Sequence, residues 1–324
     1  MIKRILTGVQ CSGEIHLGNC LSVLIPTIEL SKNNNNQTLV FIADLHSLTS
    51  VKDIKALNNN LYNAAAKWLS LGLDYNNTLF YRQSRINGIC ELTWVLNCLT
   101  PYKMLANAHA FKDKSNNLSD INTGLFDYPV LMSSDILLFQ PDYVIVGKDQ
   151  KQHIEITRDI AGIFNRTFGD VFKAPKDLII KNVELIPGTD GRKMSKSYNN
   201  TIDIFDDDTA LLKKIKSIKT DSKSEADAKD PNTCIIFSIY KNIAEENQIQ
   251  DMKNKYINGG LSYKNAKDIL YETIINKFKE ERYKFNQIKN DIELINKILK
   301  NCEIKAQQIA NETLLKVKEL LKLL

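Results

Sequence analysis

The sequence predicts a doubly wound α/β domain with a parallel sheet, followed by an all-helical C-terminal domain. Two observations support this fold class. In the first half of the chain, short apolar segments typical of strands alternate with segments whose apolar residues recur at helical spacing. After about Tyr198 the strand-like segments stop, and the remaining sequence is helical with short polar joints at 221–232 and 258–260.

The elements of the first half follow in regular alternation, as expected for parallel strands joined by crossover helices. We expect strands, each a short apolar run, at 2–9, 39–43, 78–82 and 143–146. We expect helices, each with apolar residues every three or four positions, at 17–28, 54–68, 92–99, 130–139 and 154–164. The polar segment 111–124 is expected to be a loop.

Composition places the chain among ordinary globular proteins. It has 324 residues, enough for two domains that share a core, and 43% of them are hydrophobic while 25% are charged. Apolar runs such as 137–139 are far too short to span a membrane, and residue 1 leads directly into a strand-like segment with no leader pattern. We therefore expect a soluble, cytoplasmic protein.

Cysteine and charge patterns say little about chemistry. The six cysteines include no Cys-x-x-Cys pair, so we expect reduced thiols and no metal site of the chain's own. The formal charge of +5 favours a polyanionic partner only weakly, because lysine-rich helix faces are usually just solvated.

The junction between the first strand and the first helix carries a candidate phosphate site. Gly8, Gly13 and Gly18 allow close approach of a ligand to the backbone, and His16 and Asn19 supply hydrogen-bond donors. Ligands of α/β sheets bind beyond the carboxyl ends of the strands, where a helix N-terminus offers free N–H groups. A single histidine is more often structural, so it is the placement of this motif that favours a nucleotide. Neither of the two common glycine-rich nucleotide motifs occurs.

A second candidate is the glycine-flanked loop 188–197, which contains Lys193-Met194-Ser195-Lys196-Ser197. Its cations would stabilise the charge that develops on a departing pyrophosphate. A solvated basic linker is the alternative interpretation of such a loop. The presence of the first motif in the same chain favours the catalytic one.

The two motifs carry a family resemblance. His16-Leu17-Gly18-Asn19 resembles the first signature of class I aminoacyl-tRNA synthetases, and Lys193–Ser197 matches their second signature letter for letter. Further stretches that resemble bacterial tryptophanyl-tRNA synthetases, over nearly the full length of the chain, are 10–19, 111–115, 128–138, 147–161 and 306–324. Two positions depart from the family pattern: Cys11 stands where Pro is usual, and Lys148 stands where Glu is usual.

The resemblance implies a Rossmann-like catalytic domain at 1–197 and a helical anticodon-binding domain at 198–324. It also implies a dimer-interface segment at about 92–136, a mobile loop at 188–197, and a last helix that packs back on the catalytic domain. The catalytic candidates are His16, Asn19, Lys193 and Lys196. The residues that the resemblance assigns to ATP are Gln10, Cys11, Ser12, Gly18, Asn19, Gly147, Lys148, Asp149, Ile186, Lys193, Met194, Ser195, Lys196 and Ser197.

Asp135 is a carboxylate within an otherwise apolar helix, and a buried carboxylate requires a donor. Because the indole N–H only donates, such a carboxylate suits tryptophan and offers phenylalanine nothing. A partner within the protein is the other interpretation, and the resemblance favours indole recognition. The resemblance also gives a set of pocket candidates, most of them equally compatible with a core role: Leu6, His46, Met132, Val144, Val146 and Gln150. His153 is open between a supporting and a structural role.

The implied reaction is attack of the tryptophan carboxylate on the α-phosphorus of ATP, with Mg²⁺ sharing the phosphate charge, and then transfer of the tryptophanyl group to tRNA(Trp). The implied assembly is a homodimer. Three alternatives are a tyrosyl-tRNA synthetase, a small-molecule nucleotidyltransferase and a catalytically silent tRNA-binding paralogue. The 130–139 segment speaks against a tyrosyl-tRNA synthetase. The second motif and the long helical segment after it speak against a small-molecule nucleotidyltransferase, and the intact signatures speak against a silent paralogue.

Overall fold

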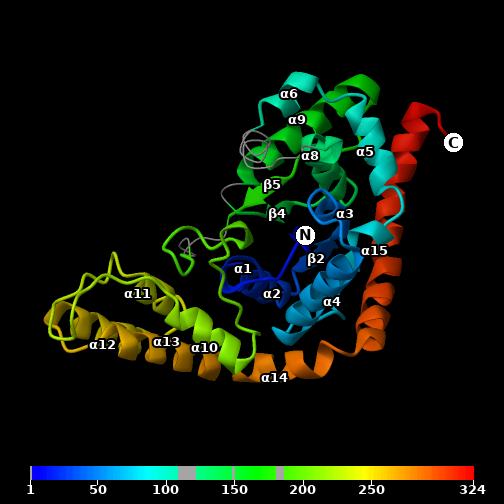
Figure 1. The fold of residues 1–324 in the computed structure, drawn as a ribbon. Coiled ribbons are helices and arrows are strands. Elements are labelled where there is room, and N and C mark those ends of the chain that lie inside the picture. Colours follow the sequence, from blue (N-terminus) through cyan, green and yellow to red (C-terminus); the bar gives the residue numbers. More distant parts are fainter. Residues whose placement is uncertain (1, 109–121, 148–149, 180–185) are drawn as a thin grey trace. The chain divides into compact units, whose positions relative to one another are not determined.

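The computed structural model describes residues 2–108, 122–147, 150–179 and 186–324 (Figure 1). The chain divides into two compact units. The first unit contains residues 1–13, 26–180 and 291–324, and the second contains 14–25 and 181–290. Within the described residues, none of the helices is both long and apolar enough to cross a membrane.

The first unit is built on a parallel sheet. Its strands are β1 (Lys3–Gln10), β2 (Asn36–Ala43), β3 (Thr78–Arg82), β4 (Tyr143–Ile145) and β5 (Lys176–Leu178). They are arranged in the order β3-β2-β1-β4-β5, and every pairing is parallel. In β2 the residues from Thr38 to Ala43 are all buried, as expected for a strand covered on both faces. The predicted doubly wound α/β fold is therefore confirmed.

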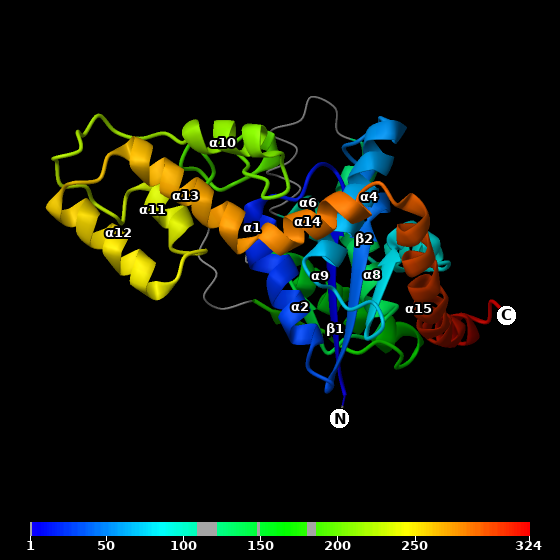
Figure 2. The same ribbon diagram turned by 90° about the horizontal axis from the view of Figure 1, so that it is seen from below.

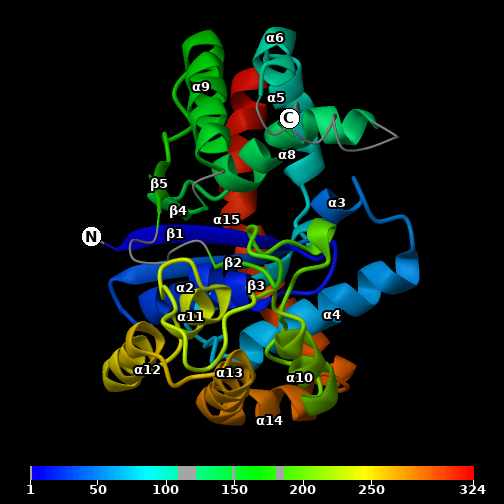
Figure 3. The ribbon, with the colours of Figure 1, turned by 60° about the vertical axis from the view of Figure 1, so that its left-hand side comes forward.

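Helices cover both faces of this sheet. The helices of the first unit are α2 (Ile25–Ser31), α3 (Asp44–Ser47), α4 (Ile54–Ser70), α5 (Ile89–Asn97), α6 (Tyr102–Ala106), α8 (Thr123–Leu137), α9 (Lys151–Phe168) and α15 (Ile292–Leu321), with a 3-10 turn η2 at Gln83–Arg85. Figure 3 shows α8 and α9 on one face and α4 on the other. α15 runs along the edge strand β3, where Arg82 forms an ion pair with Glu303 at 2.6 Å.

The second unit is mainly helical. Its elements are α1 (Leu17–Asn19), a π-helical turn η1 (Cys20–Leu24), a 3-10 turn η4 (Lys196–Tyr198), α10 (Asp208–Lys216), α11 (Ile235–Tyr240), α12 (Glu246–Asn258), α13 (Tyr263–Lys277) and α14 (Lys279–Ile288). α13 packs against both α10 and α11, and α11 also packs against α12 (Figure 2). The described residues after 198 contain no strand, as the sequence predicts.

Short polar side chains explain where several helices begin. In each case a side-chain oxygen accepts a hydrogen bond from a backbone N–H of the first turn, which satisfies a group that has no partner within the helix. The capping residues of α4, α8, α10, α13 and α15 are Asp53, Asn122, Asp207, Ser262 and Asp291.

Candidate active site

Four parallel strands of the first unit end in polar or glycine residues at one edge of the sheet. Gln10 ends β1, Asp44 follows β2, Gln83 follows β3, and Gly147 comes shortly after β4. The strand order reverses between β1 and β4, and the crevice beyond such a reversal is the usual ligand site of an open α/β sheet. The fold therefore places two of the predicted ligand residues, Gln10 and Gly147, at the expected edge.

Asp135, on α8, is only 1% exposed and is surrounded by donors. Its Oδ2 lies 2.9 Å from Nε2 of His46, and Nε2 of Gln83 donates to both carboxylate oxygens at 2.9 and 2.8 Å. Burial raises the pKa of Asp135, and the hydrogen bonds from His46 and Gln83 oppose that rise. Sequence reasoning left open whether Asp135 has a partner within the protein. It has two.

The helix that carries His46 is anchored by the turn after β3. Oε1 of Gln83 accepts the backbone N–H groups of Leu45 and His46 at 3.1 and 3.2 Å. Next to it, the backbone N–H of Ser84 donates to Oδ1 of Asp44 at 2.9 Å, and the Ser84 hydroxyl contacts the other oxygen of that carboxylate. The turn η2 thus fixes the start of α3, and Gln83 links α3 to Asp135. Sequence reasoning missed Gln83, whose one signal is its place directly after a strand.

The other residues predicted to line a tryptophan pocket differ in exposure. Leu6 of β1 and Val144 of β4 lie side by side on neighbouring strands and are buried in the core. Met132 and Val146 are partly buried against the same core. Gln150 is partly buried and precedes α9, with its N–H bonded to the carbonyl of Gly147.

His153, on α9, is buried, and its Nε2 lies 2.7 Å from the hydroxyl oxygen of Tyr128. The rings of Tyr128 and His46 in turn lie edge to face, with their centroids 6.3 Å apart. His153 is therefore linked to the side chains around Asp135 through Tyr128, which favours the supporting role over a purely structural one.

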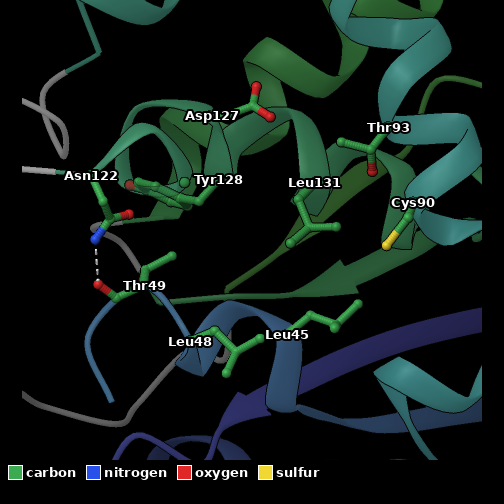
Figure 4. Close-up of a pocket in the computed structure, with 10 residues that line it drawn as sticks. Leu45, Leu48, Thr49, Cys90, Thr93, Asn122, Asp127, Tyr128 and Leu131 are labelled. Atoms are coloured by element: carbon green, nitrogen blue, oxygen red, sulfur yellow. Dashed lines mark hydrogen bonds between the residues drawn. The ribbon is translucent and has the colours of Figure 1, made fainter. Parts of the chain in front are cut away.

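A cavity of about 290 Å³ lies beside these helices in the first unit (Figure 4). Its wall is mostly apolar and combines Leu45 of α3 and the following Leu48 with Cys90 of α5 and Leu131 of α8. At its rim, Nδ2 of Asn122 donates to the carbonyl of Thr49 at 3.0 Å, the dashed bond in Figure 4. Asp135 does not line this cavity.

The first signature lies in the second unit, where His16 caps α1. The backbone N–H of Asn19 donates to Nδ1 of His16 at 3.3 Å, and the N–H of His16 donates to Oδ1 of Asn19 at 3.3 Å. Because Nδ1 accepts, the proton of the neutral ring is on Nε2. Because Oδ1 of Asn19 is occupied, its amide NH₂ is the group that remains for a ligand. Both side chains therefore present donors.

The second signature packs directly on the first. A Cβ at Gly18 would lie 3.0 Å from Nδ1 of His16 and 3.7 Å from the sulfur of Met194, so only a residue without a side chain fits without displacing His16. Met194 is 3% exposed, and its N–H donates to the carbonyl of Ile186 at 3.2 Å. Lys193 is exposed and pairs through its backbone with Pro187, and Lys196 is partly buried.

Asn200 organises the second-signature loop and was missed by sequence reasoning. It is 1% exposed, and its Nδ2 donates to Oδ1 of Asp190 at 2.7 Å and to the carbonyl of Lys193 at 3.1 Å. Its Oδ1 accepts the N–H of Ser195 at 2.8 Å. The Asn200 amide and the neighbouring Arg192 lower the pKa of Asp190 to about 2. The buried amide of Asn200 therefore makes three hydrogen bonds within the loop.

The remaining ATP candidates are distributed as follows. Gln10 is exposed and Ser12 partly buried, whereas the Cys11 thiol is fully buried 3.3 Å from the Ser47 hydroxyl. Any contact of Cys11 with a nucleotide would therefore involve its backbone. Other predicted groups lie outside the described residues: the stretch 111–115, Lys148, Asp149 and the side chain of Ser197.

Three carboxylates of the second unit gather in one place. Oxygen atoms of Glu14, Asp203 and Asp206 lie within 4.8 Å of one another, with Glu14 exposed and Asp203 buried. Among the described residues this is the one group of three such side chains close enough to hold a cation. Because acidic groups often gather without an ion, we assign no metal to it.

Comparisons with known proteins agree with this geometry. The model of the family "tRNA synthetases class I (W and Y)" matches residues 3–279. The tryptophan–tRNA ligase of Campylobacter jejuni is 41% identical over 316 residues, which cover 98% of both chains. The corresponding protein of Fusobacterium nucleatum is 39% identical over 322 residues, again 98% of each.

A solved structure is equally similar. The crystal structure of the Campylobacter jejuni tryptophanyl-tRNA synthetase, complexed with ADP and tryptophan, superposes with a TM-score of 0.92 at 41% identity. The match covers 98% of this chain and 99% of that one.

Proposed function

The chain belongs to the class I tRNA synthetases of the tryptophan and tyrosine group, and we propose how its residues divide the work of a tryptophan–tRNA ligase. This enzyme activates L-tryptophan with ATP to give tryptophanyl-adenylate and pyrophosphate, and then esterifies the amino acid onto tRNA(Trp). The observation that carries the assignment of residues is the packing of Met194 on Gly18, because it joins the two signatures within one unit.

Asp135 recognises the indole N–H in this proposal. A carboxylate offers about four acceptor sites, and His46 and Gln83 use three, so one further donor fits. Phenylalanine supplies no donor, and leaving a buried acceptor without its partner is a strong basis for rejection. Leu6, Met132, Val144, Val146 and Gln150 would complete the pocket.

ATP is held by the signature residues in this proposal. The Nε2 proton of His16 and the amide of Asn19 donate to phosphate oxygens. Lys193 and Lys196 stabilise the charge that develops on the departing pyrophosphate. Mg²⁺ enters with ATP as part of that substrate and shares the charge of its phosphates.

The first step needs no general base, because the tryptophan carboxylate is ionised at neutral pH. Its oxygen attacks the α-phosphorus, and the bond from that phosphorus to the bridging oxygen of pyrophosphate breaks. The protein's contribution is therefore positioning and charge stabilisation. In the second step a hydroxyl of the terminal tRNA ribose attacks the adenylate carbonyl, and AMP leaves.

The helical residues after 198 contact the anticodon in this proposal. Lysines gather where α10 ends and just beyond it, at Lys213, Lys214, Lys216, Lys219 and Lys223, and phosphate contacts of this kind position an RNA. The role of tRNA charging in protein synthesis also places the enzyme in the cytoplasm.

The segment at about 92–136 forms a homodimer interface in this proposal. Two large side chains on its described part, Trp94 of α5 and Tyr102 of α6, are 71% and 72% exposed. Aromatic side chains are enriched in protein interfaces, so these two support the proposal. Sedimentation of the purified chain would test this part of the proposal.

The experiment that tests the assignment is amino-acid-dependent ATP–pyrophosphate exchange in the wild type and in Asp135→Asn. We expect exchange with tryptophan alone, and its loss or relaxation in the variant. Exchange with tyrosine would transfer the chain to the sister activity. No exchange with either amino acid would contradict the catalytic assignment and favour a tRNA-binding protein without activity.

A further inference from the structure

Gln83 is completely buried and touches the groups that recognise tryptophan in the proposed function, but it is outside the residue set predicted from sequence. We propose that Gln83 is a positioning residue for tryptophan, which fixes the orientation in which the Asp135 carboxylate accepts the indole N–H. This inference rests on the proposed function and deepens it, because it names a further determinant of specificity.

The orientation of the Gln83 amide is set by its surroundings. Its Oε1 accepts two backbone N–H groups, those of Leu45 and His46, at 3.1 and 3.2 Å. A flipped amide would turn its NH₂ toward those donors and its oxygen toward the Asp135 carboxylate, so every contact would be lost. Gln83 is therefore held as a donor to Asp135.

Gln83 restrains both oxygens of the Asp135 carboxylate. Nε2 lies 2.9 Å from Oδ1 and 2.8 Å from Oδ2, so it sits in front of both oxygens, and Nε2 of His46 approaches Oδ2 at 2.9 Å. A carboxylate restrained at both oxygens cannot rotate about its terminal bond without breaking a bond to Gln83. The single acceptor site that remains then has a defined direction on Oδ1.

Gln83 also favours the ionised form of Asp135. Burial raises the pKa of this carboxyl, and the hydrogen bonds of His46 and Gln83 act in the opposite direction. Without Gln83 the carboxyl would be protonated more readily. A protonated carboxyl can present an O–H to the indole N–H, and two donors cannot bond to each other.

A purely structural role is the competing explanation, because Gln83 also holds the start of α3. The adjacent Ser84 provides a matched control. Its backbone and hydroxyl bind Asp44 at the start of the same helix, but it makes no hydrogen bond to Asp135. Ser84→Ala therefore loosens α3 while it leaves the bonds of Asp135 in place.

The test compares two amino acids in ATP–pyrophosphate exchange: tryptophan and an analogue with sulfur in place of the indole N–H. In Gln83→Met we expect kcat/KM for tryptophan to fall about tenfold to a hundredfold, as for loss of hydrogen bonds to a charged group, with little change for the analogue. The preference for tryptophan should therefore shrink by that factor. In Ser84→Ala the preference should stay at its wild-type value.

Gln83→Glu, nearly the same size, provides a second readout if Gln83→Met does not fold. The introduced carboxyl donates to Asp135 only when protonated, so KM for tryptophan should fall as the pH is lowered from about 8 to about 6, opposite to the wild type. Equal losses for both amino acids in Gln83→Met, or a Gln83→Glu profile parallel to the wild type, would overturn the inference. Absence of exchange in the wild type would instead contradict the proposed function.

Discussion

Replacing Asn200 with alanine should release the second-signature loop. The Asn200 side chain accepts the N–H of Ser195 at 2.8 Å and donates to the carbonyl of Lys193 at 3.1 Å, and it also bonds to Asp190. The backbone bond from Thr189 to the Asn200 carbonyl does not depend on the side chain. The variant therefore keeps the chain path and loses the side-chain bonds that hold the loop.

The magnitude follows from the two bonds to backbone groups within the signature. Each neutral hydrogen bond contributes about 0.5–1.5 kcal/mol, so the pair stabilises the loop by about 1–3 kcal/mol. At roughly 1.4 kcal/mol for each factor of ten, kcat/KM for ATP should fall by roughly 5-fold to 150-fold. This range assumes that ATP must restore the ordered loop on binding, and the contact with Asp190 is left out of it.

ATP–pyrophosphate exchange at varied ATP, together with tryptophan binding by equilibrium dialysis, checks this prediction. Asn199→Gly is the matched control, because Asn199 is exposed and has φ of 50°, which glycine adopts readily. The affinity for tryptophan alone should be unchanged in both variants. A change in kcat/KM for ATP of less than about twofold in Asn200→Ala would refute the reasoning.

Three further outcomes are expected. Glu303→Ala removes the ion-pair partner of the largely buried Arg82 side chain and leaves it the hydrogen bond to Asn296, so the free energy of unfolding in urea should fall by about 3 kcal/mol; a loss below about 1 kcal/mol, typical of surface pairs, would show that water replaces the carboxylate. Because burial raises the pKa of Asp135, KM for tryptophan should rise as the pH falls through that pKa while KM for ATP does not; parallel profiles would contradict the role of its charge. Lys196→Ala should abolish exchange and leave tRNA binding nearly intact, with binding in both proteins weakening steeply as salt is added; equal loss of both functions would contradict the division of labour.

The sheet could be predicted because its strands differ in composition from what surrounds them. The expected strand at 78–82 coincides with β3, and that at 2–9 lies one residue from β1. β5 was missed because its three residues, Lys176–Leu178, include two charged side chains and form no apolar run. Its pairing with β4 is a long-range contact that local sequence does not encode.

Parts of the site are visible in sequence and parts are not, for a physical reason. The signatures are local: the bonds between His16 and Asn19 join residues three apart, so spacing alone reveals them. Gln83 acts on a residue that is far away in sequence. Asn200 acts from a buried position inside a loop. Gln83 lies 52 residues from Asp135, and nothing around it in sequence distinguishes it from a polar residue at the end of a strand.

The hydrogen bonds around Asp135 also give a reason why this chain should need no second, hydrolytic site to remove wrongly activated amino acids. Selection by size in an apolar pocket discriminates only about 10-fold to 200-fold for each methylene, whereas a site built around a buried hydrogen bond rejects an analogue without that group by about 10⁴-fold to 10⁵-fold. In the proposed function, Asp135 supplies such a bond only while its charge and direction are maintained. Accuracy would therefore depend on His46 and Gln83 as much as on the carboxylate, so variants at either position should misactivate phenylalanine before they lose the ability to use ATP.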